Sequence, residues 1–128
     1  MNAKTEVRIS ELTGKALDWA VALATGAEEV KTTEHGVSCI YQLPDGGCWT
    51  NLYQPSIDWG QGGFLIERYN IQLSFNGHGR GGFCAYVCSD QGIEERPSGG
   101  GKTHLLAAMR AIVAAKFIDT ISVPAELI

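Results

Sequence analysis

Apolar and polar residues alternate along several short stretches of the chain, a pattern typical of β-strands that bury one face. The clearest stretch is 69–75, in which every second residue is apolar. Shorter alternating stretches predict further strands at 7–9, 37–43, 48–53, 83–87 and 121–123. The turn-forming sequence Pro44-Asp45-Gly46 lies between two of them, so a β-hairpin is expected over 37–53.

Two other stretches repeat apolar residues at helical spacing. The first helix is expected to begin at an N-cap, Ser10 or Thr13, and to end before Gly26, where a left-handed backbone is favoured. The second is expected to follow the capping residue Thr103 and to reach about Phe117. The polar or glycine-rich segments between the elements are expected to form loops at 27–36, 55–63 and 89–101.

The fold class that these elements predict is α+β. Strands with one apolar face and helices with an apolar stripe must cover each other, and the economical arrangement is an antiparallel sheet with two helices packed on one face. The chain has 128 residues, 45% of them apolar, which suits a single domain over 1–128. No apolar run is long enough to cross a membrane, and the polar N-terminus predicts no secretion signal.

The helix predicted over 103–117 is apolar on most of its circumference. Its alanines leave a low surface that allows another backbone to come close: Ala107, Ala108, Ala111, Ala114 and Ala115. One sheet face does not easily cover such a helix all round. We therefore expect a homodimer, in which a second copy of the chain covers the rest.

The charge of the chain bears on the class of its partner. The net charge is −4, the pI is about 5.3, and the ten Lys and Arg residues are scattered rather than clustered. Nucleic-acid-binding domains usually carry a basic stripe. The composition therefore argues against nucleic acid but keeps it as an alternative, because folding can gather scattered charges on one face.

The four cysteines, Cys39, Cys48, Cys84 and Cys88, do not form a recognisable metal motif. None forms a C-x-x-C pair, and only Cys84 and Cys88 have a spacing that zinc sites use. We expect reduced, buried thiols, no metal and no cofactor. No serine or cysteine stands beside a histidine in a known nucleophile motif, so we name no catalytic residue and do not expect an enzyme.

Two glycine-rich segments partly match nucleotide-binding motifs. Residues 77–82 contain G-x-G-x-x-G, but a strand follows where a helix is needed, so the segment is expected to be a hairpin tip. The sequence Gly101-Lys102-Thr103 matches the end of a P-loop, but Arg96 stands where that motif needs glycine. At the start of the second helix, Lys102 and Thr103 remain candidates for holding an anion, with a flexible connection as the alternative.

The segment 56–63 is the best candidate for a binding surface. Trp59 is a large aromatic residue beside glycines that do not shield it, and its polar neighbours offer an acceptor and an amide. Aromatic anchors with polar neighbours are typical of interface centres. The candidate residues are Asp58, Trp59, Gln61, Gly62 and Gly63. In the alternative, Trp59 folds back to close the sheet edge and Asp58 caps a turn.

Three stretches together resemble the NinX-like family of phage proteins. They are ELTGKALDWAVA at 11–22, SIDWGQGGFLIER at 56–68, and 105–127, which contains LLAAMRA and VPAEL. Phe64 and His104 stand where the family usually has proline. The resemblance implies a phage accessory protein in the host cell cytoplasm, with an unknown host or phage protein as its partner and no activity to carry over. A nucleic-acid-binding accessory factor is the alternative function, and a small enzyme with an unidentified substrate is the third possible function.

Overall fold

The chain forms strands, α-helices and two short 3-10 helices, which the computed structural model describes over residues 3–76, 82–88 and 98–128. In chain order the elements are β1 (Lys4–Arg8), η1 (Ile9–Glu11), α1 (Gly14–Ala24), β2 (Glu28–Thr33), β3 (Gly36–Leu43), β4 (Gly46–Thr50), α2 (Trp59–Arg68), β5 (Ile71–Asn76), β6 (Gly82–Val87), β7 (Ser98–Gly101), α3 (His104–Phe117), β8 (Thr120–Pro124) and η2 (Ala125–Leu127). All strand pairs are antiparallel, so the predicted α+β class is confirmed.

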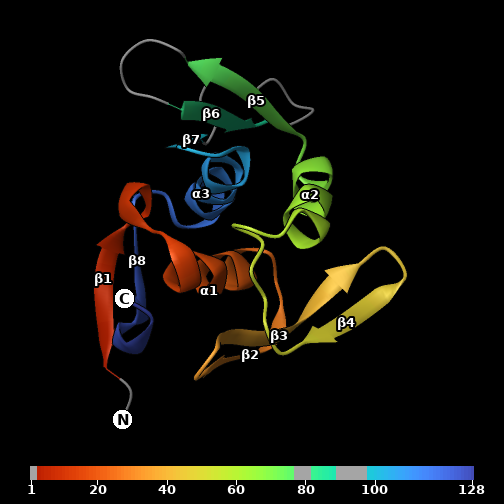
Figure 1. Cartoon of the computed structure of the whole chain (residues 1–128), viewed down its shortest axis with the longest axis vertical. Coiled ribbons are helices and arrows are strands. Elements are labelled where there is room, and N and C mark those ends of the chain that lie inside the picture. The colour runs from red at the N-terminus through yellow and green to blue at the C-terminus, as the bar shows by residue number, and fades with distance from the viewer. Residues whose placement is uncertain (1–2, 77–81, 89–97) are drawn as a thin grey trace.

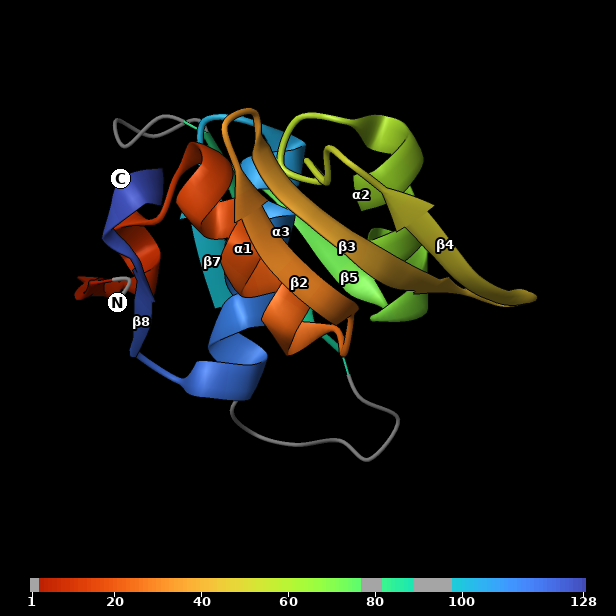
Figure 2. The same ribbon diagram turned by 90° about the horizontal axis from the view of Figure 1, so that it is seen from below.

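The described strands form three sheets, and the helices lie between two of them. The sheet β5–β6–β7 covers α3, the sheet β2–β3–β4 covers α1, and the two helices pack on each other (Figure 1). β1 and β8 pair along the side of this stack (Figure 2), and α2 lies beside α3. The layering therefore differs from the predicted sheet with two helices on one face, because each helix has its own sheet.

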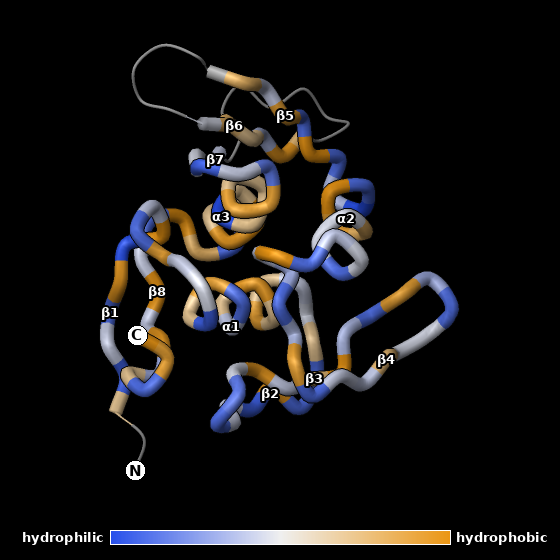
Figure 3. Tube along the Cα trace, in the orientation of Figure 1, coloured by the Kyte–Doolittle hydropathy of each residue, from blue (hydrophilic) through white to orange (hydrophobic). Residues whose placement is uncertain are grey.

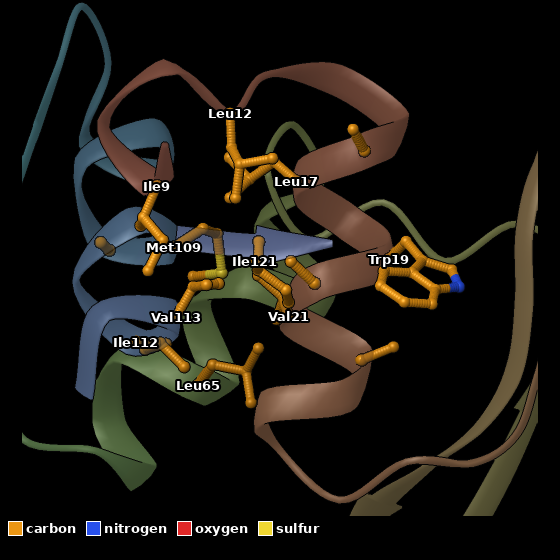
Figure 4. Close-up of a cluster of buried hydrophobic side chains, with 14 of the residues drawn as sticks. Ile9, Leu12, Leu17, Trp19, Val21, Leu65, Met109, Ile112, Val113 and Ile121 are labelled. Atoms are coloured by element: carbon orange, nitrogen blue, oxygen red, sulfur yellow. The ribbon is translucent and has the colours of Figure 1, made fainter. Parts of the chain in front are cut away.

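The core lies mainly between α1 and α3. Leu17 and Val21 of α1 are buried together with Met109 and Val113 of α3 (Figure 4). Figure 3 shows how strongly apolar residues are concentrated along these two helices. Trp19 lies on the opposite side of α1 and is also buried. α1 thus buries apolar side chains on two faces, as a helix at the centre of a layered fold must.

β7 and α3 approach each other at backbone distance. A Cβ atom placed on Gly99 would lie 2.5 Å from the carbonyl oxygen of Ala107 and 2.5 Å from the amide nitrogen of Ala111. The alanines of α3 therefore allow the close approach that the sequence predicts, but the neighbouring backbone is a glycine-rich strand of the same chain. Because α1 and α2 also contact α3, its apolar circumference no longer requires a second copy of the chain.

Three predicted loops contain regular structure. The loop predicted at 55–63 is wrong from Trp59 onward, because α2 begins there, and Gly62 allows this helix to pack closely against Pro55 and Leu105. The strand β2 forms within 27–36. A β-bulge between Glu28 and Lys31 interrupts the alternation of apolar and polar residues by which a strand is recognised in the sequence. β7 forms at the end of 89–101. The glycine motif at 77–82 lies outside the described residues, except for its last glycine.

Candidate functional site

Four aromatic rings from four elements lie next to one another where α2 and α3 begin. Trp59 is the first residue of α2, His104 is the first residue of α3, and Phe75 and Phe83 face each other across β5 and β6. Trp59 is 57% exposed and Phe75 is 70% exposed, whereas Phe83 is half-buried. These four residues are called the aromatic surface below.

The rings of the aromatic surface form a continuous row. The ring centroids of Trp59 and His104 are 6.0 Å apart, those of His104 and Phe83 are 3.7 Å apart, and those of Phe83 and Phe75 are 5.3 Å apart. Tilted pairs at such distances are favourable beyond the area that they bury. Each ring therefore contacts the next, and the four side chains form one contiguous aromatic surface.

Asp58 and Gln61, two of the predicted binding residues, hold the backbone in place. Asp58 is the N-cap of α2, and its Oδ1 accepts hydrogen bonds from the N–H groups of Gly60 at 2.7 Å and Gln61 at 3.3 Å. The side chain of Gln61 accepts from the N–H of Gln54 at 2.7 Å and donates to the carbonyl of Leu52 at 3.4 Å. Both side chains thus have a structural role, and the exposed aromatic side chain between them is that of Trp59.

The adjacent glycines of α2 differ in their surroundings. A Cβ atom on Gly62 would lie 2.3 Å from the carbonyl oxygen of Pro55 and 2.7 Å from Leu105, so α2 can pack here only without a side chain. A Cβ atom on Gly63 would meet only the ring of Trp59, at an ordinary 3.7 Å. Gly62 is therefore explained by packing, whereas Gly63 lies beside the aromatic surface.

The predicted anion-binding residues lie next to His104. The hydroxyl of Thr103 accepts a hydrogen bond from the N–H of Leu106 at 3.0 Å, which caps α3 as the sequence predicts. Lys102 is exposed. The structure thus brings the two candidate regions of the sequence, 56–63 and 102–103, to the same aromatic surface. Anion binding there stays a prediction.

A buried carboxylate supports the segment that leads into α2. Asp18 of α1 is only 4% exposed, and its Oδ1 accepts a hydrogen bond from the N–H of Ser56 at 2.9 Å. Burial raises the pKa of Asp18 to about 6, an effect that the Ser56 N–H partly offsets. Within the described part of the chain, the hydroxyl of Ser56 is buried without a hydrogen-bond partner. Asp18 is not recognisable as a buried acceptor in the sequence, because its partner Ser56 is 38 residues away.

The cysteines do not gather at the aromatic surface as a reactive site. Cys39 is buried, and burial raises the pKa of its thiol to about 11, which keeps it protonated at neutral pH. The thiols of Cys48, Cys84 and Cys88 are free and half-buried. Over the residues that the structure describes, no three His, Cys, Asp or Glu side chains are grouped as metal ligands would be. The expected absence of zinc and of a cofactor stays a prediction.

Phe75, Phe83 and His104 are not recognisable as site residues in the sequence. The alternation along the two strands places both phenylalanines on the same face as Ala85, which predicts burial in the core. Ala85 is fully buried, but the side chains on this face of the sheet are more exposed at the end that carries Phe75. The one signal available in the sequence was the position of Phe75 and Phe83 on either side of the glycine-rich segment 77–82.

Comparison with known proteins places the chain in a phage family. The family model described as "Bacteriophage P22, NinX" matches residues 8–116, a range that includes the whole aromatic surface. A search of curated proteins gave no match. Among the described helices, none has the length and apolar character needed to cross a membrane. Since the match covers most of its length, the chain belongs to the bacteriophage P22 NinX family and is a phage accessory protein.

Proposed function

We propose that this phage protein acts in the host cell cytoplasm by binding another protein through the aromatic surface, Trp59, Phe75, Phe83 and His104. The observation that carries the proposal is the exposure of Trp59 and Phe75 at the two ends of one row of contacting rings. Single exposed apolar side chains are common on protein surfaces and need no explanation. A contiguous group of them, held in order by its own contacts, is typical of an interaction site.

The chemistry of the surface favours a protein as the partner. Tryptophan and other aromatic residues are enriched among the residues that dominate the binding energy of protein interfaces. The chain carries a net charge of −4, which opposes the binding of a phosphate backbone. Lys102 is exposed and stands two residues before His104 in the sequence, so it is a cation close to the start of α3. The expected partner therefore offers an apolar side chain to the rings and an acidic group to Lys102.

The proposal is tested by recovering partners of the tagged, full-length protein from infected host cells. The double variant Trp59→Ala with Phe75→Ala removes the exposed ends of the row. Trp49→Ala is the matched control, because Trp49 is 65% exposed on β4, in a different sheet. A partner should be recovered with the wild type and with Trp49→Ala, and lost with the double variant. Recovery by the double variant at the wild-type level contradicts the proposal.

Affinity measured with the purified partner makes the test quantitative. The few anchor residues that dominate an interface, often tryptophans, contribute about 2 kcal/mol or more, so Trp59→Ala should weaken binding at least about thirtyfold. Trp49→Ala should leave the dissociation constant unchanged. Equal losses for the two variants would mean that the partner does not distinguish the aromatic surface from another exposed tryptophan.

Single-stranded nucleic acid is the second candidate, and the row of rings is the observation that favours it. Bases stack on exposed aromatic side chains with little sequence preference, at about 1–3 kcal/mol per base. Fluorescence anisotropy with labelled single-stranded DNA distinguishes the two: binding that falls steeply with salt and is lost in Trp59→Ala supports nucleic acid. A homodimer through the same surface is the remaining proposal, and light scattering of the wild type and the double variant tests it.

A further inference from the structure

A cavity separate from the aromatic surface lies along the edge strand β7. Its volume is about 370 Å³, within the range of small-molecule sites, and it is bounded by β6, β7, the second half of α3 and η1. Its polar lining residues include Arg110 and Ser98. The apolar lining residues include Ile9, Ala114 and Ile118, called the apolar wall below, and Asp119 also lines the cavity.

The backbone holds the guanidinium of Arg110 in place at this cavity. Its Nε donates to the carbonyl of Leu12 at 2.9 Å, and its Nη1 donates to the carbonyl of Gly100 at 2.7 Å. An arginine has five N–H donors, so these two bonds leave three, all on Nη1 and Nη2. Within the described part of the chain, no carboxylate lies within ion-pair distance of Arg110. The cavity therefore contains an oriented cation with unused donors.

Ile118, at the end of α3, lies in a strained backbone conformation beside the same cavity. Its φ is 74° and its ψ is −73°, and the N–H of Asp119 donates to the carbonyl of Phe117 at 3.0 Å. This is a γ-turn of the rare strained form, which a β-branched residue seldom adopts. Ile118 is 84% exposed, so burial in the chain does not explain the strain. Strain of this kind is characteristic of functional positions.

We infer that this cavity binds a small monocarboxylate with an apolar body, a function beyond the proposed protein binding. The carboxylate pairs with the unused donors of Arg110, because a planar guanidinium matches a planar carboxylate with two parallel hydrogen bonds. The apolar body lies against Ile9, Ala114 and Ile118. Asp119 also lines the cavity, and its negative charge repels a dianion such as phosphate more strongly than it repels a ligand with a single negative charge.

NMR titration of the isotope-labelled, full-length chain with hexanoate tests the inference. Hexanoate should cause saturable shifts of the Arg110 Nε–H signal and of the backbone amides of Gly100 and Ile118. Hexanamide has the same body without the charge, and inorganic phosphate has charge without the body. Both should bind at least about tenfold more weakly than hexanoate, because each lacks one half of the interaction.

Three variants assign the binding to the cavity. Arg110→Gln should reduce hexanoate affinity at least about tenfold, but it also removes the hydrogen bonds to two backbone carbonyls. Ile118→Gly relieves the positive φ while removing part of the apolar wall, so it should keep the fold and reduce affinity at least about threefold. Lys116→Gln removes a cation from an exposed position of the same helix and should bind like the wild type.

Several outcomes would overturn the inference. The absence of saturable shifts with hexanoate would do so, as would equal affinity for hexanamide. Unchanged hexanoate affinity in folded Ile118→Gly protein would show that the apolar wall takes no part. None of these results depends on the partner of the aromatic surface, so failure here leaves the proposed function to its own test.

Discussion

The imidazole of His104 lies against the ring of Phe83, with ring centroids 3.7 Å apart and ring planes 31° apart. The contact joins the first residue of α3 to β6, and it connects Trp59 on one side with Phe75 on the other. Two exposed aromatic side chains from distant parts of the sequence thereby become parts of one surface. Changes to the outer rings should therefore test the proposed binding with little effect on the fold, because Trp59 and Phe75 are mostly exposed.

Replacing the ring of Trp59 should have little effect on folding. Trp59→Ala is expected to lower the free energy of unfolding by less than about 1 kcal/mol, because the side chain is 57% exposed. Leu17→Ala, in the core between α1 and α3, should cost about 2–5 kcal/mol and serves as the reference. Urea unfolding measures both. A loss of about 3 kcal/mol or more for Trp59→Ala would show that the ring belongs to the core.

Neighbouring glycines of α2 should respond in opposite directions. Gly62→Ala is expected to destabilise the fold by about 1–3 kcal/mol, because the added Cβ would overlap the backbone of Pro55. Gly63→Ala should stabilise it by about 0.5–1 kcal/mol, since alanine favours a helix and the space is free up to the ring of Trp59. Thermal unfolding of the two variants side by side gives the comparison. Equal effects would contradict the packing of α2 described above.

The cap of α2 should tolerate an amide but not a methyl group. Asp58→Ala removes the acceptor for the N–H groups of Gly60 and Gln61 and should cost about 1 kcal/mol. Asp58→Asn keeps a side-chain oxygen and should cost much less, because asparagine is as good an N-cap as aspartate. If denaturant unfolding showed the same loss for both variants, the charge of Asp58 rather than its capping bond would be responsible.

Stability should depend on pH through Asp18. Its pKa is raised from 3.8 to about 6 in the folded state, so the folded chain binds the proton more tightly than the unfolded chain does. Protonated Asp18 therefore stabilises the fold below pH 4, and this stabilisation is lost as the pH rises through 6. The free energy of unfolding should fall by about 3 kcal/mol over this range through Asp18 alone. Asp18→Asn should remove this dependence and exceed the wild type in stability at pH 7.

The matched control for that experiment is Asp45→Asn, which removes an exposed carboxylate from the β3–β4 turn. The quantity to compare is the difference between variant and wild type at pH 4 and at pH 7, because other carboxylates contribute their own pH dependence. For Asp18→Asn this difference should grow with pH. A difference that is the same at both pH values would show that Asp18 does not titrate in this range.

Local signals in the sequence predicted much of the fold. The alternation over 69–75 and 83–87 predicted β5 and β6, and Thr103 was recognised as the cap of α3. Gly26 has a φ of 77°, as expected after α1. These features depend on residues that are close in sequence, so pattern and turn chemistry were sufficient to find them.

Contacts between distant segments explain what the sequence could not predict. Glycine is a poor helix former, so a segment with Gly60, Gly62 and Gly63 was assigned to a loop, although close packing requires glycine at position 62. The division into three sheets likewise depends on which strands meet after folding. For the site, Trp59 was predicted, but its connection to Phe83 exists only because both meet His104 in space.

Photo-crosslinking in infected host cells tests the binding role of the aromatic surface most directly. A photoreactive phenylalanine derivative is placed at position 59 in one variant and at position 49 in another, two exposed tryptophan positions on different parts of the fold. Position 59 should give a discrete protein adduct on irradiation, and position 49 should not. An adduct of twice the chain mass would indicate a homodimer, and an adduct sensitive to nuclease would indicate nucleic acid. Equal crosslinking from both positions, or none from position 59, would contradict a partner-binding role for the aromatic surface.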